Sequence, residues 1–183
     1  MTMTPEEKKS LFRTAKRKVV YQATHFTYIV DEITSSSGTV HTYDSVVHPG
    51  ASVIIPIDDD GGLILVRQYR NSIDAFTYEL PAGKIDKGED PETTAIRECQ
   101  EEIGKYPGNL QKLFETYPSP AYSTEILHFY LATQLTDKAL AQDELEAIDV
   151  HCISLEEALR WIKEGKITDA KTALGIFYYE KMC

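Results

Sequence analysis

The residues of this chain best suited to chemistry lie in the acidic run Arg97-Glu98-Cys99-Gln100-Glu101-Glu102 and in the loop 83–89 before it. At about 100° per residue, a helix through this run places Glu98 and Glu102 beside its apolar stripe and Glu101 on the opposite side. The stripe consists of Ala95, Cys99 and Ile103. A solvated charge run keeps its glutamates away from the core, so the pattern indicates a function for Glu98 and Glu102.

Two carboxylates at positions i and i+4 repel each other, and they repel more strongly when half buried. A divalent cation would neutralise them. Magnesium prefers oxygen ligands, takes one or two carboxylates from a protein and leaves other positions to waters and phosphates. Such an ion lowers the pKa of a bound water and neutralises phosphate charge. The formal net charge of −10 agrees, because an acidic protein needs a cation or a focused arginine to bind an anionic diphosphate.

Composition argues against several other functions. The net negative charge disfavours nucleic acid and anionic lipid as partners. Apolar runs fall short of the roughly 20 residues that cross a bilayer, and the polar segment 1–10 is unlike a secretory leader. The three cysteines and five histidines show no metal-ligand spacing, and no GxSxG elbow is present. We therefore expect a cytoplasmic protein with reduced thiols, which uses neither zinc nor a serine nucleophile.

Three helices are predicted, the first two from their capping signals. Asp90 caps a helix over about 91–103, which has proline at its first position and glycine just after its end. Ser154 opens a capping box ahead of a helix that stops at Gly165. A final helix is predicted over about 170–181. We expect Arg97, in the first of these helices, to pair with the glutamate four residues later.

Strands are predicted between and before the helices. Alternating and β-branched residues over 18–47 predict a small antiparallel sheet. Further strands are predicted at 53–55, 63–66, 112–118, 125–132 and 148–153. The turn 58–62 is predicted to be the tip of a hairpin between the first two of these strands. The order of elements indicates an α/β fold with two regions, 1–48 and 49–183.

The spacing of the acidic run resembles the Nudix box. That motif reads glycine, five residues, glutamate, seven residues, then arginine-glutamate-apolar-any-glutamate-glutamate-any-glycine-apolar. The matching residues are Gly83, Glu89, Arg97, Glu98, Glu101, Glu102 and Gly104. Cys99 stands at the first apolar position as a small substitute, and Lys105 stands where an aliphatic residue is usual. Neither departure falls on a metal-ligand position, so the departure at Lys105 concerns only how the helix exit packs.

Other stretches are similar to the ADP-ribose pyrophosphatase branch of the Nudix hydrolases. They are His48-Pro49-Gly50-Ala51, Gln68-Tyr69-Arg70, Glu79-Leu80-Pro81-Ala82-Gly83-Lys84, Ser119-Pro120-Ala121 and Asp169-Ala170-Lys171-Thr172-Ala173. Pro120 lies sixteen residues after Gly104, which is the habitual proline position of this branch, although Ala121 replaces the usual glycine. GDP-mannose hydrolases share several of these features, so the resemblance indicates the reaction class more firmly than the substrate.

The resemblance implies a role for each matching acidic residue. Glu98 and Glu102 would bind magnesium, or manganese in its place, helped by the backbone carbonyl of Ala82. Glu102 would thereby serve catalysis, and Glu101 would support the cluster. In these relatives a glutamate on a later loop acts as the base or as the final metal ligand. The candidates are Asp143, Glu144 and Glu146. We prefer Glu146, because a strand follows it as in the family's loop.

The resemblance also implies two substrate-binding residues, Arg70 and Glu79. A guanidinium group suits phosphate and stacks on rings, so Arg70 is a candidate contact for the diphosphate or the base. The alternative for Arg70 is a surface arginine at the end of a strand.

By this resemblance, the chain is an α/β/α Nudix sandwich with a mixed sheet, preceded by a small antiparallel sheet that dimerises two copies. The implied reaction is magnesium-dependent hydrolysis of the diphosphate of a nucleoside diphosphate sugar, foremost ADP-ribose to AMP and ribose 5-phosphate. Alternatives are GDP-mannose, a dinucleoside polyphosphate or a coenzyme A derivative as substrate. A binding module without catalysis is a further alternative, which would have no need of three box glutamates.

Overall fold

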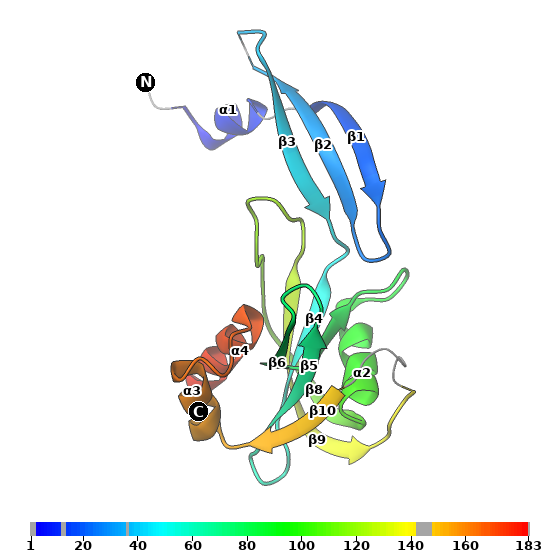
Figure 1. Ribbon diagram of the computed structural model, residues 1–183, viewed down its shortest axis with the longest axis vertical. Coiled ribbons are helices and arrows are strands. Elements are labelled where there is room, and N and C mark those ends of the chain that lie inside the picture. The colour runs from blue at the N-terminus through cyan, green and yellow to red at the C-terminus, as the bar shows by residue number, and fades with distance from the viewer. Residues whose placement is uncertain (1–2, 12–13, 36, 142–147, 183) are drawn as a thin grey trace. The chain divides into compact units, whose positions relative to one another are not determined.

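The computed structural model describes residues 3–11, 14–35, 37–141 and 148–182. It divides into two compact units (Figure 1). The first unit comprises residues 1–49 with 119–125, and the second comprises residues 50–118 with 126–183. No helix in these described ranges is long and apolar enough to cross a membrane.

The first unit is built on a three-stranded antiparallel sheet, as predicted. Its elements are α1 (Pro5–Ser10), β1 (Thr14–Gln22), β2 (Thr27–Thr34) and β3 (Val40–Val47), with the strands in the order β1-β2-β3. One face of β2 is buried at Ile29, Asp31 and Ile33. Segment 119–125 joins this unit through β3, where the Val46 N–H donates to the Tyr122 carbonyl over 2.7 Å.

The second unit contains two sheets. One is mixed, in the order β7-β4-β9-β8, with β4 parallel to β9 and the other pairs antiparallel. The other is antiparallel, in the order β10-β5-β6. The strands are β4 (Ala51–Pro56), β5 (Leu63–Arg70), β6 (Ala75–Glu79), β7 (Ala82–Lys84), β8 (Lys105–Thr116), β9 (Leu127–Asp137) and β10 (Ile148–Ile153).

Three capped helices complete the second unit, and all three predicted helices are confirmed. They are α2 (Pro91–Glu102), α3 (Leu155–Lys163) and α4 (Ala170–Glu180). Asp90, Ser154 and Asp169 accept a hydrogen bond from the backbone N–H three residues later, which satisfies one free donor of each first turn. Gly104 and Gly165 follow the ends of α2 and α3 with positive φ, a conformation that glycine adopts without strain.

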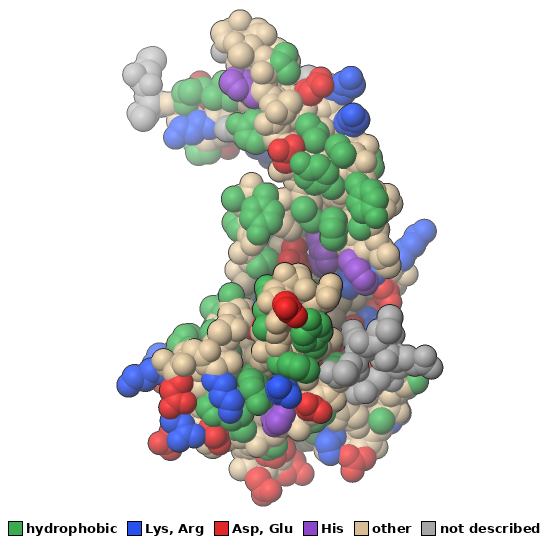
Figure 2. All heavy atoms as spheres, viewed as in Figure 1, with side chains coloured by type: hydrophobic (Ala, Val, Ile, Leu, Met, Phe, Trp, Pro, Cys, Tyr) green, Lys and Arg blue, Asp and Glu red, His purple; other side chains and the backbone are tan. Residues whose placement is uncertain are grey.

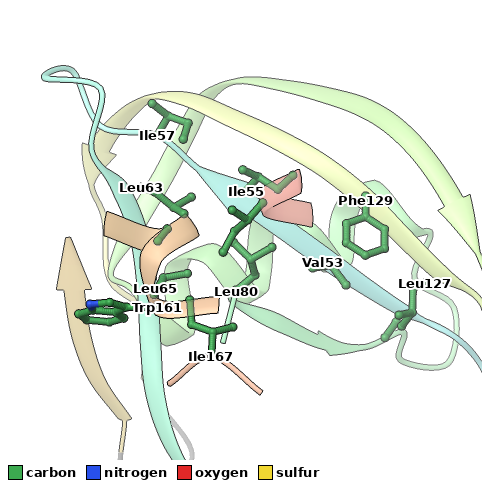
Figure 3. Packing of buried hydrophobic residues seen from close by; sticks show 13 residues of the cluster. Val53, Ile55, Ile57, Leu63, Leu65, Leu80, Leu127, Phe129, Trp161 and Ile167 are labelled. Carbon is green, nitrogen blue, oxygen red and sulfur yellow. The ribbon is translucent and has the colours of Figure 1, made fainter. Parts of the chain in front are cut away.

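The main core of the second unit is formed by residues of the central strands and the last two helices (Figure 3). Strand β4 is buried along its whole length, and the first four residues of β5 are buried too. Trp161 of α3 and Ile176 of α4 belong to the same cluster. The continuous apolar runs of β4 and β5 are explained by this burial on both faces.

Two expectations about strands differ from the structure. The tip at 58–62 forms, with the Asp58 N–H donating to the Gly62 carbonyl, but β4 and β5 share only the isolated bridge Ile57↔Leu63. Beyond this bridge the two strands belong to different sheets, so the predicted hairpin is wrong as a pairing of strands. Strands β6 and β7 and the first half of β8 have no counterpart among the predicted strands. These segments lack a long apolar pattern, because they are short or only half buried.

Candidate functional site

The acidic face of α2 is arranged as its periodicity predicts. Glu98 and Glu102 are only 8% and 4% exposed, whereas Glu101 is half-buried. Cys99, between them in sequence, is fully buried in the core, and this burial raises the pKa of its thiol to about 12. The thiol is therefore protonated at neutral pH, so Cys99 acts here as the small apolar residue that the motif requires.

Strand β7 brings a second segment of chain against these carboxylates. The Ala82 N–H donates to Glu102 Oε2 over 3.0 Å. A Cβ atom on Gly83 would lie 1.8 Å from Glu98 Oε1, so only glycine leaves room for that carboxylate. Pairing of β7 with β4, in the register Val53↔Ala82, holds the segment in place. The motif's first glycine is thus explained by close approach of Glu98 to the backbone.

Arg97 makes more contacts than the single pairing predicted for it. Its guanidinium donates to Glu101 at 2.8 Å, as expected, and also to Glu98 at 2.6 Å. It further donates to Glu89 at 3.0 Å and to the Lys84 carbonyl at 3.1 Å. The hydrogen bonds from Arg97 to the Glu89 carboxylate hold the pKa of Glu89 below its usual range. Arg97 therefore fastens the loop before α2 to the helix and offsets part of the charge on Glu98.

The composition of this site fits magnesium. Two buried carboxylates, Glu98 and Glu102, lie on one helix face against the backbone at Ala82 and Gly83. Within the described part of the chain, no three His, Cys, Asp or Glu side chains form a ready-made metal cage. Magnesium does not need one, since it usually binds one or two carboxylates and completes its shell with water and phosphate.

A second cluster surrounds Glu79, at the end of β6. Arg70 of β5 binds this buried carboxylate through two hydrogen bonds, Nε to Oε1 at 2.7 Å and Nη2 to Oε2 at 2.6 Å. Thr77 and Lys171 also donate to it. Burial opposes ionisation of Glu79, but Arg70 and Lys171 outweigh it and lower the pKa to about 2. Glu79 is therefore fully ionised at neutral pH.

A cavity of about 340 Å³ lies beside this second cluster. Arg70, Thr77, Glu79, Asp169 and Lys171 are among the residues that line it. Among the groups that raise the pKa of Arg70, Glu79 is the strongest and the charge of Glu102 also contributes. Because Arg70 holds the buried Glu79 carboxylate through two hydrogen bonds, the alternative of an isolated surface arginine is not supported.

The structure brings most of the predicted site residues together, and it adds some that sequence reasoning missed. Lys171, Asp169 and Thr77 were not predicted to contribute to a site, although the stretch 169–173 carries part of the family resemblance. Their link to Glu79 crosses up to 92 positions of sequence, which no local pattern reveals. The three candidates for the base, Asp143, Glu144 and Glu146, lie outside the described residues.

The helix exit shows how the unusual Lys105 is accommodated. Lys105 begins β8, and its ammonium group pairs with Asp137 of β9 at 2.6 Å. This contact lies on the surface, since the Asp137 side chain is 91% exposed. Of the described cysteines, Cys99 is buried and Cys152 is exposed, and neither forms a disulfide.

Comparison with known proteins agrees with this geometry. The chain is 34% identical over 170 residues to an ADP-ribose pyrophosphatase of Bacillus subtilis (strain 168), with 92% of each chain covered. It is 35% identical to a methanol dehydrogenase activator of Bacillus methanolicus, again with 92% of each covered. A GDP-mannose pyrophosphatase of Yersinia enterocolitica is 33% identical, with 84% of this chain and 83% of the relative covered.

The fold is shared with a solved structure of an ADP compounds hydrolase. The TM-score is 0.82 at 24% sequence identity, and the match covers 92% of both chains. Residues 46–173 match the NUDIX domain, a range that includes β4 to α3, the acidic face of α2 and the cluster around Glu79. With this match and with relatives above 30% identity over nearly its whole length, the chain belongs to the NUDIX family.

Proposed function

We propose that this Nudix pyrophosphatase hydrolyses the diphosphate bond of a nucleoside diphosphate sugar, with ADP-ribose as the preferred substrate and AMP and ribose 5-phosphate as products. The observation that carries the proposal is the burial of Glu98 and Glu102 on one face of α2, against Ala82 and Gly83. Buried carboxylates without a function would cost stability, because each must be removed from water. The ADP-ribose pyrophosphatase relative supports the choice of substrate.

In this proposal, magnesium is held by Glu98, Glu102 and the backbone carbonyl of Ala82, and manganese can replace it. When bound, the ion lowers the pKa of a water molecule and neutralises phosphate charge. Glu101 supports the cluster through Arg97, which binds Glu98 and Glu101 together.

Arg70 is the proposed contact for the diphosphate. Its Nε and Nη2 donate hydrogen bonds to Glu79, and Arg70 is one of the residues that line the cavity. A guanidinium fork suits phosphate oxygens, and electrostatic stabilisation of phosphate charge is a main source of rate in such reactions. Glu79 contributes to substrate binding because its carboxylate accepts two hydrogen bonds from Arg70 and so orients that residue.

Glu146 is the proposed general base, on the sequence argument alone. Glu146→Gln is expected to lower kcat about 10²-fold with little change in KM, because a lost base affects the chemical step. Glu144→Gln is the matched comparison. If Glu144→Gln lowers kcat and Glu146→Gln does not, the base lies two residues earlier. If neither changes turnover, the base is not on this loop.

A substrate panel tests the proposed reaction. The full chain is incubated with magnesium and ADP-ribose, GDP-mannose, a dinucleoside polyphosphate or coenzyme A, and the products are identified by mass. We expect AMP and ribose 5-phosphate, no turnover in EDTA, and a loss of several orders of magnitude in kcat for Glu102→Gln. Unchanged turnover by Glu102→Gln in saturating magnesium would remove the metal assignment. Binding without hydrolysis of any compound would favour a non-catalytic module.

GDP-mannose is the second candidate substrate. It is favoured by the GDP-mannose pyrophosphatase of Yersinia enterocolitica, whose similarity to this chain covers most of both sequences. The panel separates the two candidates through kcat/KM. A higher kcat/KM for GDP-mannose than for ADP-ribose would assign the guanosine substrate, while the same diphosphate chemistry would remain.

We propose further that the protein is a cytoplasmic homodimer in which residues 1–48 dimerise two copies. Strand β1 is at the edge of its sheet, and edge strands and exposed apolar patches commonly mark interaction surfaces. Large apolar side chains of this region are exposed: Val19, Val20, Tyr21, Phe26, Val40 and Tyr43. Hydrophobic side chains are visible on the surface of the first unit in Figure 2.

A further inference from the structure

Lys171, in the first turn of α4, is held between two carboxylates. Its side chain is 16% exposed, and its ammonium group donates to Glu79 and, at 3.0 Å, to Asp169. Arg70 shares the same Glu79 carboxylate from the opposite strand. The family motifs recognised in the acidic helix do not include Lys171, and the proposed reaction assigns it no role.

The charges in this second cluster balance only when Lys171 is present. Arg70 and Lys171 carry two positive charges, and Glu79 and Asp169 carry two negative charges. Without the lysine, Arg70 would be the only positive charge facing the two carboxylates, and less of its charge would remain for an anionic ligand. Because Glu79 is almost completely buried, little water is available to screen the Glu79 charge. Lys171 therefore controls how much of the positive charge on Arg70 remains available to a ligand.

The same turn of α4 is joined to the backbone that leads to the acidic site. Asp169 accepts hydrogen bonds from the Thr172 N–H at 2.9 Å and from the Thr172 hydroxyl at 2.6 Å. The Thr172 oxygen in turn accepts from the Leu80 N–H at 2.8 Å. Leu80 directly follows Glu79 and lies two residues before Ala82. The position of Lys171 relative to Glu79 is thus fixed by a buried hydrogen bond at Leu80 and by part-buried hydrogen bonds at Asp169.

We infer that Lys171 is a positioning residue for diphosphate binding, which acts through the shared Glu79 carboxylate to keep Arg70 oriented and part of its charge available to the ligand. The inference rests on the proposed function, in that Arg70 is the residue that meets the substrate. Lys171 itself is directed to two carboxylates and is not proposed to touch the ligand.

A double-mutant cycle tests this inference in the full chain. Kd values for ADP-ribose and for inorganic pyrophosphate are measured by calorimetry in EDTA, where the acidic site holds no metal and turnover is prevented. The proteins are wild type, Arg70→Met, Lys171→Met, the double variant and Lys171→Arg. Steady-state kcat and KM with magnesium are measured in parallel, and melting temperatures report folding.

We expect Lys171→Met to raise Kd and KM about tenfold, the size expected for loss of one charge-assisted interaction, with kcat changed less than about threefold. Lys171→Arg should restore most of the affinity, since it restores the charge. The double variant should bind no more weakly than Arg70→Met, because a residue that acts only through Arg70 has no effect once Arg70 is gone.

Other outcomes overturn the inference. Wild-type affinity in Lys171→Met, with weakened binding in Arg70→Met, would leave Lys171 a purely structural residue. Multiplying effects in the double variant would mean that Lys171 touches the ligand directly.

If Lys171→Met does not fold, Glu79→Gln/Lys171→Met removes one charge of each sign. It should still weaken binding, because Arg70 loses the Glu79 carboxylate that orients it. Wild-type affinity in that variant contradicts the inference.

Failure of the proposed function gives a different result. If wild type hydrolyses ADP-ribose with magnesium but binds neither probe in EDTA, the inference about Lys171 falls and the proposed reaction stands. If wild type hydrolyses no nucleotide sugar, the proposed reaction falls, and the pyrophosphate measurements still decide whether Lys171 and Arg70 act together.

Discussion

At the scale of single residues, Gly83 determines where Glu98 can lie. A methyl group there would overlap the Glu98 carboxylate, with 1.8 Å between Cβ and Oε1. We predict that Gly83→Ala displaces Glu98 and lowers kcat at least tenfold. A displacement of about 1 Å in an active site can lower the rate about 10²-fold. Gly61→Ala is the control. Alanine is strained at Gly61 by the positive φ of that residue, but a Cβ there would contact no other atom. Equal kcat values for both variants would contradict the prediction.

A second prediction at the residue scale concerns how Glu79 affects the free energy of unfolding at acid pH. Its pKa is lowered from 4.5 to about 2 in the folded protein, so its contribution to stability is present above the unfolded pKa and is lost as pH falls. The whole contribution is roughly 3 kcal/mol, of which roughly 1 kcal/mol should be lost between about pH 5.5 and 3.5. Urea unfolding at these two pH values measures it. In Glu79→Gln this part of the pH dependence should disappear; an unchanged pH dependence would show that Glu79 is not the group responsible.

At the scale of elements, α4 must approach the strands closely to place Lys171 and Thr172 at Glu79 and Leu80. Gly175 permits this approach, since a Cβ there would lie 2.5 Å from Leu80 Cδ1 and 3.3 Å from Phe129 Cε1. All three residues are buried. The helix therefore uses a residue of low helix propensity because packing outweighs propensity at this position.

We predict that Gly175→Ala destabilises the protein by about 1 kcal/mol. Overpacking typically costs about 1–3 kcal/mol, and the better helix propensity of alanine returns about 1 kcal/mol. Chemical unfolding measures the difference. Leu174→Ala, at the neighbouring and 41% exposed position, is the control and should have a smaller effect. A more stable Gly175→Ala protein would mean that the Leu80 side chain moves aside at little cost.

At the scale of the whole molecule, the proposed homodimer is tested most directly on strand β1, the edge strand of the first sheet. Val19 is paired with the buried Ile29, and Val40 is paired with Thr34. Positions 29 and 34 of β2 point to opposite faces, since successive side chains of a strand alternate. Both valines are 57% exposed, so they form a matched pair for substitution.

We predict that sedimentation of the wild type gives twice the mass of the chain, and that Val19→Glu shifts it toward the monomer. A buried unpaired charge in an interface is costly, whereas Val40→Glu on the other face should leave the dimer intact. Dissociation by Val40→Glu alone would place the interface on the opposite face. A wild-type monomer at all concentrations would remove the dimer proposal.

The sequence by itself determined the acidic face of α2, the helix caps and most strands, because each depends on contacts within a few residues. Helical periodicity places Glu98 and Glu102 at the core, and Asp90 and Ser154 cap the helices that follow them. The spacing of the Nudix box was equally visible, since its residues lie within one loop and one helix.

Only the tertiary structure decided which strands pair and which charges meet. The hairpin expected at 58–62 opens into two sheets, because burial of β4 and β5 on both faces outweighs the local preference of the turn. Arg97 gathers three glutamates where the helix period alone predicted one partner. Lys171 reaches Glu79 across 92 positions, because a buried carboxylate must find its cations wherever the fold brings them.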